Sequence, residues 1–263
     1  MQLSEIDQVQ VPPADKLVAL FISDTHLEAG SPHTAEAFFD FLDRFGKQAD
    51  QLYLLGDLFE YWAGDDDRDA PFNARVVAAL RALSDAGVML FWMAGNRDFL
   101  VGSAFMQATG ATPLADPSVA VIAGQRMVLT HGDAQCTDDV DYQAFRTTVR
   151  TPEWQQAFMD MPLAKRLAVI GQMREQSRAA QKTKVLQIMD VNVRAITGLF
   201  AATGTSLMIH GHTHRPGTHE LEMEGRRVIR HVLPDWDFEN GNMRGGGIAI
   251  YANGTVASLS ACR

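Results

Sequence analysis

The stretch LVALFISDTH, residues 17–26, joins a short apolar run to two residue types that bind metal ions. The run is rich in Leu, Val, Ile and Phe and is too short for a buried helix, so it predicts a buried strand over residues 17–23. Asp24 and His26 follow that strand directly. The same order, an apolar run and then polar side chains, recurs along the chain and decides the fold class.

Four further runs of this kind predict buried strands, over residues 51–55, 88–94, 126–130 and 206–209. Apolar residues at helical spacing separate the first three strands, at positions 35, 38, 39, 42 and 45 and at positions 76, 77, 80 and 83. Strands that alternate with amphipathic helices indicate a layered α/β core. Towards the C-terminus, residues 220–232 and 247–259 predict paired strands, with a hairpin turn in the second segment at Asn253-Gly254.

Composition excludes several other classes of protein. The length of 263 residues suits one large domain or two small ones. The proportions of hydrophobic residues, 46%, and charged residues, 21%, are typical of a globular protein. A net charge of -9 argues against binding to nucleic acid, which needs clustered Lys and Arg. The sequence shows no secretory signal and no membrane span, and its two cysteines fit a reducing compartment. We therefore expect a cytoplasmic protein.

Residues 140–200 differ from the rest of the chain in charge. They hold nine Lys and Arg against five Asp and Glu, a net +4, which leaves -13 for the remainder. Thr151-Pro152 and Pro162 predict helix starts in this segment. We predict a core formed by residues 1–139 and 201–263 and a helical cap insertion over 140–200. The insertion either packs a small core of its own or forms a basic, partly apolar cap for an anionic amphiphile.

Residue types that bind metal ions follow all five predicted strands. The seven candidate ligands are Asp24, His26, Asp57, Asn96, His131, His212 and His214. The carboxyl ends of strands line the ligand crevice of open α/β sheets, so we expect these side chains to converge. Carboxylate, imidazole and amide ligands without a thiolate suit Mn²⁺, Fe or Zn²⁺. Seven ligands are too many for one ion, but two ions about 3.5–4 Å apart, bridged by one carboxylate, would use them all and would serve phosphoester cleavage.

The intervals between the candidate ligands support this arrangement. Asp24 and Asp57 are 33 residues apart, Asp57 and Asn96 are 39 apart, and Asn96 and His131 are 35 apart, which suits one strand–helix–strand unit each. The interval from His131 to His212 is 81 residues because it contains the predicted insertion. The cap therefore connects two loops that form the site, and it could cover the crevice.

The order of these motifs, Asp-x-His, Gly-Asp, Gly-Asn-x-Asp, His-Gly and Gly-His-x-His, resembles that of the calcineurin-like metallophosphoesterases over residues 17–216. The resemblance implies an α/β protein with a four-layer αββα sandwich and two metal ions at one end. It also implies a ligand set for each ion. One ion would be held by Asp24, His26, Asp57 and His214, and the other by Asp57, Asn96, His131 and His212.

Arg97 departs from the pattern of that superfamily, most members of which carry His at this position. An arginine stays protonated in proteins and so makes a poor general acid. A fixed cation can instead stabilise charge that develops in the transition state. A phosphate can leave without a proton, unlike an alkoxide, so Arg97 favours pyrophosphate cleavage. We expect Arg97 and Asp57 to be the catalytic residues.

Longer motifs resemble one subfamily, the UDP-2,3-diacylglucosamine pyrophosphatases of lipid A biosynthesis. These motifs are FISDTHL (21–27), LGDLFE (55–60), GNRDFL (95–100) and GHTHRP (211–216). The resemblance implies Mn²⁺-dependent hydrolysis of a lipid-linked nucleotide to UMP and 2,3-diacylglucosamine 1-phosphate, with the acyl chains in the cap and peripheral contact with the inner membrane. The substrate contacts that it implies are Asn96, Arg97, Asp139, Ser177, Gln181, Lys184 and His212.

Two other functions stay open at this point. The first is a phosphodiesterase or nucleotide pyrophosphatase that acts on a soluble substrate, and the second is a metal-free interaction scaffold with the same fold. The acidic run Asp65, Asp66 and Asp67 predicts either a third cation site or a loop with capping side chains. We expect His210 to support the site without binding a metal ion.

Overall fold

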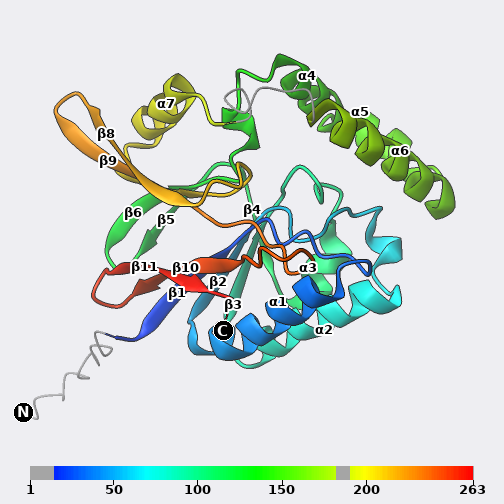
Figure 1. Ribbon diagram of the computed structural model, residues 1–263, viewed down its shortest axis with the longest axis horizontal. Helices are drawn as coiled ribbons and strands as arrows, with labels where there is room; N and C mark the ends of the chain where they lie inside the picture. Colours follow the sequence, from blue (N-terminus) through cyan, green and yellow to red (C-terminus); the bar gives the residue numbers. More distant parts are fainter. Residues whose placement is uncertain (1–14, 182–189, 263) are drawn as a thin grey trace, which may run out of the picture.

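The computed structural model describes residues 15–181 and 190–262 and contains two β-sheets packed face to face (Figure 1). The first sheet has the order β11-β10-β1-β2-β3-β4, with bounds Val256–Ser260, Gly246–Tyr251, Leu17–Ile22, Gln51–Leu55, Met89–Met93 and Thr112–Leu114. The second has the order β5-β6-β7-β9-β8, with bounds Ser118–Ile122, Gln125–Leu129, Leu207–His210, Arg226–Val232 and Gly217–Met223. Strands β1 to β4 run parallel, as do β6, β7 and β9, so both sheets have parallel centres.

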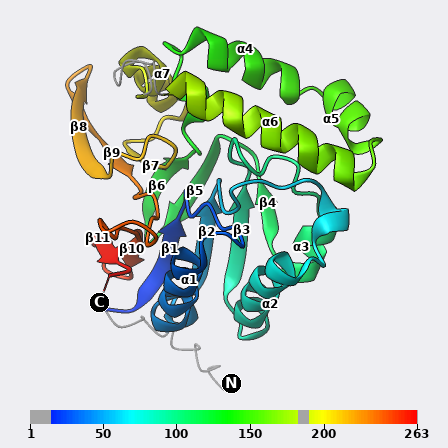
Figure 2. The same cartoon turned by 45° about the vertical axis from the view of Figure 1, so that its right-hand side comes forward.

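Helices cover the outer faces of both sheets. The first sheet carries α1 (Pro32–Arg44), α2 (Pro71–Asp85) and α3 (Ser103–Thr109), and the second carries α7 (Val193–Thr203). Helices α4 (Val140–Val149), α5 (Pro152–Met159) and α6 (Leu163–Gln181) lie together along one side of the sandwich (Figure 2). Three short 3₁₀ turns complete the described elements, at Gly46–Gln48, Asp65–Asp67 and Asp133–Gln135.

Three apolar clusters separate four layers. Strand β1 shows why, because its side chains alternate between two of the clusters. Leu20 and Ile22 pack towards α1 and α2, whereas Ala19 and Phe21 pack between the two sheets. The third cluster lies between the second sheet and α7, where Phe200 is fully buried. The predicted four-layer αββα sandwich is therefore confirmed.

The five strands predicted from apolar runs are present, and α1 and α2 begin at Pro32 and Pro71. The two C-terminal segments form hairpins in different sheets: β8 pairs with β9, and β10 pairs with β11 through a turn that contains Gly254. Strands β4 and β5 were not predicted. Each lies at the edge of its sheet, where β4 is only three residues long and β5 leaves Val119 and Val121 exposed.

Helices α5 and α6 begin after Thr151 and Pro162, as expected from the helix-start signals. Thr151 caps α5 by accepting a hydrogen bond from the backbone N of Trp154. The division of the chain at residues 139 and 200 stays a prediction. Helix α7 begins within the predicted insertion and ends three residues beyond it, and it packs on the second sheet and supplies the fourth layer.

A buried arginine joins α6, one of the three cap helices α4, α5 and α6, to the core. The Arg166 side chain on α6 is 3% exposed and donates hydrogen bonds to the backbone oxygens of Ala63 and Met161. Its guanidinium also pairs with both carboxylate oxygens of Asp66, which is half exposed. Arg166 therefore ties α6 to the loop that follows β2.

We predict that Arg166→Met lowers the free energy of unfolding by about 1–3 kcal/mol, because it leaves buried carbonyl oxygens without their donors. Hydrogen exchange in α5 and α6 should quicken in the same variant. The control is Lys165→Met, which removes an exposed positive charge from the neighbouring position. Equal changes in the two variants, measured by thermal unfolding and hydrogen exchange, would contradict this anchoring role.

Candidate metal centre

The loops that follow β1, β2, β3, β6 and β7 converge at one end of the sandwich and carry all seven candidate ligands. The structure brings their side chains into two neighbouring groups, one built on Asp24 and the other on Asp57. Both of these aspartates are almost completely buried. The loops after five separate strands thus supply one compact site.

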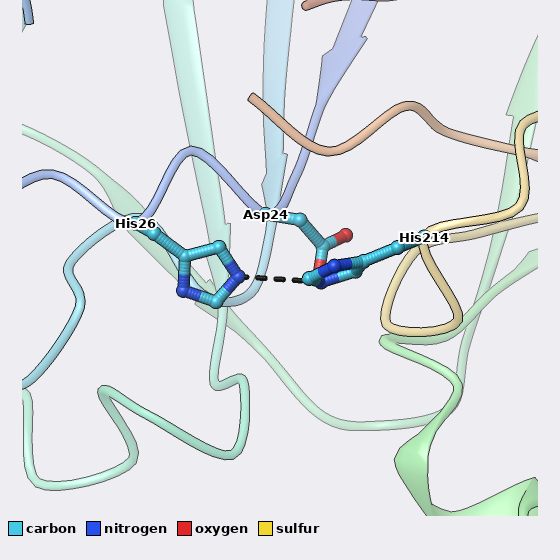
Figure 3. Close-up of side chains that lie close together, drawn as sticks. All are labelled: Asp24, His26 and His214. Carbon is cyan, nitrogen blue, oxygen red and sulfur yellow. Dashed lines mark hydrogen bonds and ion pairs between the residues drawn. The ribbon is translucent and has the colours of Figure 1, made fainter. Parts of the chain in front are cut away.

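The first group consists of Asp24, His26 and His214, which point towards one another in Figure 3. The Nε2 atoms of the two histidines lie 3.3 Å apart, and His214 Nε2 lies 3.4 Å from Asp24 Oδ1. One ligand atom from each residue falls within 4.8 Å of the others. A single metal ion could contact all three.

The far side of each imidazole ring shows why a cation fits this group. His26 Nδ1 lies 2.9 Å from Glu60 Oε2, and His214 Nδ1 lies 3.6 Å from Asp235 Oδ2. These are ion-pair contacts, and the negative charge of a carboxylate on that side favours the proton on Nδ1 and a lone pair on Nε2. Two such lone pairs and a carboxylate oxygen then face the same point. Their mutual repulsion is relieved by a cation, so the residues fit the metal that the resemblance implies.

The second group consists of Asp57, His131 and His212, with Asn96 between the two imidazoles. Asn96 Oδ1 lies 3.1 Å from His131 Nε2 and 2.8 Å from His212 Nδ1. His131 Nδ1 donates to the backbone oxygen of Leu55 over 2.9 Å, which again directs Nε2 towards the centre. These four residues form a second set of donors for a divalent ion.

Asp57 lies between the two groups. Its Oδ2 is 4.0 Å from His26 Nε2 and its Oδ1 is 3.7 Å from His131 Nε2. Each carboxylate oxygen thus faces a different group, the arrangement required of a bridging ligand in a two-metal site.

Five of the seven candidate ligands have left-handed backbone conformations. Their φ angles are 53° for Asp24, 47° for His26, 52° for Asp57, 66° for His212 and 54° for His214. Such residues cost about 1–3 kcal/mol each and cluster at functional sites. Backbone bonds hold these turns: Asp24 N donates to Gly56 O over 3.1 Å, and His26 N donates to Asp57 O over 3.0 Å.

Negative charge dominates the electrostatics of the centre. Burial alone would lower the pKa of His131, but the carboxylates of Asp57, Asp24 and Asp133 outweigh it and raise that pKa to about 9. Burial and the neighbouring His131 lower the pKa of His212 to about 4. The field of the carboxylates therefore attracts cations, and His212 keeps a neutral ring at neutral pH.

Asp98 supports the centre without facing it. Asp98 is fully buried and accepts hydrogen bonds from the backbone N atoms of Asp57, Leu58 and Gly95, which fixes the loops after β2 and β3. His210 belongs to neither group, its Nε2 lies 3.0 Å from Arg230 Nη1, and its supporting role stays a prediction. The position of Asp98 in the motif GNRDF was the available signal for its role.

The acidic run after β2 consists of structural side chains. Asp65 accepts hydrogen bonds from the backbone N atoms of Gly102, Ala104 and Phe105 and so caps α3. Asp66 pairs with Arg166, and Asp67 accepts a hydrogen bond from Asn73. These contacts agree with the capping interpretation of the run.

The predicted substrate residues fall at different places. Arg97 lies beside the centre, where its backbone N donates to Asp57 Oδ1 over 2.8 Å. Its buried Nε atom has no hydrogen-bond acceptor within residues 15–181 and 190–262. Asp139 caps α4 by accepting from Tyr142 N over 3.1 Å. Ser177 and Gln181 lie on α6, in the part whose side chains the structure leaves undescribed, and Lys184 lies outside the described residues.

Helix α4 reaches the loops of the centre. Tyr142 Oη and Arg146 Nε both donate to Asp133 Oδ2, over 2.6 and 2.8 Å, and the Tyr142 ring stacks on His212 with centroids 5.8 Å apart. Just beyond α4, Arg150 Nη2 donates to Gly95 O over 2.8 Å. The cap therefore contacts the loops that carry the candidate ligands.

Comparison with known proteins defines the class of this chain. The sequence model of the calcineurin-like phosphoesterase family matches residues 17–216, and the chain belongs to this family.

Curated relatives are similar over most of the chain. UDP-2,3-diacylglucosamine hydrolase from Chromohalobacter salexigens is 46% identical over 84% of this chain and 89% of that protein. The proteins of the same name from Aromatoleum aromaticum and Escherichia coli are 48% and 43% identical, over 83% and 85% of this chain and 89% and 92% of their own lengths. Within the superfamily, the chain belongs with the UDP-2,3-diacylglucosamine hydrolases. No helix in the described ranges is long and apolar enough to span a membrane.

We predict that Gly95→Ala weakens Mn²⁺ binding by about 10–100-fold, the range for residues that orient metal ligands. A Cβ atom at this position would overlap both Oδ1 and the backbone N of Asp57. The matched control is Gly171→Ala on α6, where a Cβ meets nothing within 4 Å. Isothermal titration of both variants with Mn²⁺ checks this, and wild-type affinity in Gly95→Ala would show that the close approach to Asp57 is dispensable.

Proposed function

We propose that the protein hydrolyses the pyrophosphate bond of UDP-2,3-diacylglucosamine to UMP and 2,3-diacylglucosamine 1-phosphate, as the names of its relatives suggest. Water adds to the α-phosphorus, the bond to the bridging oxygen breaks, and the lipid phosphate leaves. The observation that carries the proposal is the pair of ligand groups joined by Asp57, whose two oxygens face His26 and His131.

The proposed cofactors are two divalent ions, most suitably Mn²⁺, held by the seven ligands. Asp24, His26, His214 and Asp57 would hold one ion, and Asp57, Asn96, His131 and His212 would hold the other. When bound, such ions polarise phosphate oxygens and lower the pKa of water. Oxygen and imidazole donors without thiolate agree with Mn²⁺.

Arg97 is the proposed charge-stabilising residue. An arginine side chain is a fixed cation, and the buried Nε of Arg97 has no acceptor among the described groups. A phosphate oxygen beside the centre would supply that acceptor, and the interaction would strengthen as charge moves onto the leaving phosphate. Arg97 is therefore proposed to act as an electrostatic catalyst.

The cap provides surfaces for the rest of the substrate. Phe99 and Trp154 are half-buried with ring centroids 6.2 Å apart, and Trp154 stacks on the buried Phe158. The predicted insertion carries a net +4, which suits a lipid-linked nucleotide with two phosphates. Val140 and Val193 are exposed apolar residues of the same region, and with this charge they favour peripheral contact with the cytoplasmic face of the inner membrane.

Hydrolysis in ¹⁸O-water tests the reaction and the point of attack together. With UDP-2,3-diacylglucosamine and Mn²⁺, mass spectrometry should find the label in UMP, and Asp57→Ala should release no UMP. Label in the lipid phosphate would overturn attack at the α-phosphorus. Equal turnover of UDP-sugars without acyl chains would overturn the lipid substrate in favour of a soluble nucleotide.

We predict that Arg97→Ala lowers kcat by about 10²–10³-fold, the range for loss of one group that stabilises transition-state charge. Metal content, measured by plasma mass spectrometry, should stay at the wild-type level. Arg81→Ala removes an exposed arginine of α2 and is the control. Loss of bound metal in Arg97→Ala would assign this residue a structural role instead.

A further inference from the structure

A chain of charged side chains runs from cap helix α6 to a candidate metal ligand. Glu60 lies at its middle and uses its two oxygens for different partners. Oε2 lies 2.9 Å from His26 Nδ1, and Oε1 accepts hydrogen bonds from Arg174 Nη2 and Nε over 2.8 and 3.1 Å. His26 Nε2 faces Asp24 and His214 on the opposite side of the ring.

Arg174 is held firmly between the cap and the core. Its Nη2 also donates to Glu28 Oε2 over 3.1 Å, its guanidinium lies 5.3 Å from the centroid of the Tyr61 ring, and its side chain is 18% exposed. Glu28 and Glu60 both belong to loops of the core, whereas Arg174 belongs to α6. The position of α6 therefore determines whether Glu60 keeps this partner.

Of the other histidines, His131 and His214 have their supports in the core, whereas His212 stacks on Tyr142 of α4. The backbone oxygen of Leu55 accepts from His131 Nδ1, and Asp235, beside His214, is paired with Arg244 over 2.7 Å. Among the described groups, His26 is the candidate ligand whose ring nitrogen lies beside a carboxylate bound by a side chain of α6. Displacement of α6 should thus affect the group of Asp24, His26 and His214 more than the group of Asp57, His131 and His212.

We propose that Glu60 and Arg174 are positioning residues for His26, through which the seating of helix α6 sets the metal affinity of the group formed by Asp24, His26 and His214. The proposal rests on the two-metal site of the proposed function. A carboxylate behind a ligating imidazole fixes its tautomer and orientation and raises its basicity. An arginine that holds this carboxylate with two hydrogen bonds fixes its direction in turn.

Mn²⁺ titration of variants tests the proposal, with calorimetry for affinity and electron paramagnetic resonance to separate single ions from coupled pairs. Glu60→Gln should weaken one of the two binding steps by about 10–100-fold and leave the other unchanged. The resonance signal at intermediate Mn²⁺ should then come from single ions. Arg174→Gln should weaken the same step by a smaller factor.

Glu28→Gln is the matched control, because Glu28 shares Arg174 but is not the carboxylate beside His26. It should leave both binding steps at wild-type affinity. Turnover by Glu60→Gln should recover as Mn²⁺ is raised, with an unchanged KM for the lipid substrate. If Glu60→Gln fails to fold, as judged by its thermal transition, Arg174→Gln decides the question.

Three results would overturn the proposal or its basis. Wild-type affinity for both ions in Glu60→Gln, or in Arg174→Gln when it alone folds, would refute the positioning role and leave the proposed hydrolysis untouched. An equal loss in Glu28→Gln would show that the affinity does not depend on the carboxylate beside His26, and would overturn the positioning role of Glu60. A wild-type protein that binds fewer than two ions would instead refute the proposed two-metal site.

Discussion

Crowding of electron lone pairs at the carboxyl ends of the strands is the constraint on which this architecture depends. Asp24 and the imidazoles of His26 and His214 point their donor atoms at a common centre, although such atoms repel one another without a cation. Their backbones are also held in left-handed conformations that a relaxed chain avoids. The free energy of packing in the two-sheet core offsets both the repulsion and the backbone strain. Three apolar clusters in this core fix the strands that carry the loops.

The parts of the molecule that local patterns encode could be predicted from the sequence. Short apolar runs predict five buried strands, and each run is followed by residues that the structure brings together at the metal centre. The Asn253-Gly254 turn and the proline helix starts at Pro32 and Pro71 are equally local signals. Ligands such as Asp57 and His131 could be named because parallel strands deliver their ends to one edge of the fold.

Other features of the fold and the site depend on contacts between distant segments, and no local sequence pattern predicts them. Strand β4 is three residues long and includes Pro113, so it gains its place only by pairing with β3. Glu60 stood within a quoted motif, but its role depends on Arg174, which lies 114 residues away. Asp235 meets His214 only because the loop after β9 returns to the centre. Neither the partner nor the direction of such side chains can be inferred from spacing.

The packing of helix α7 explains how the 81-residue interval between His131 and His212 is organised. Strands β6 and β7 are adjacent and parallel, so α7, packed on their outer face, is the helix of an ordinary β–α–β crossover. Helices α4, α5 and α6 are then an elaboration inserted into that crossover ahead of its helix. The entropy of closing such a connection changes slowly with its length. The cap is therefore a module: its length and lining can diverge, or be exchanged by design, while the strand register of the two sheets that carry the metal centre stays the same.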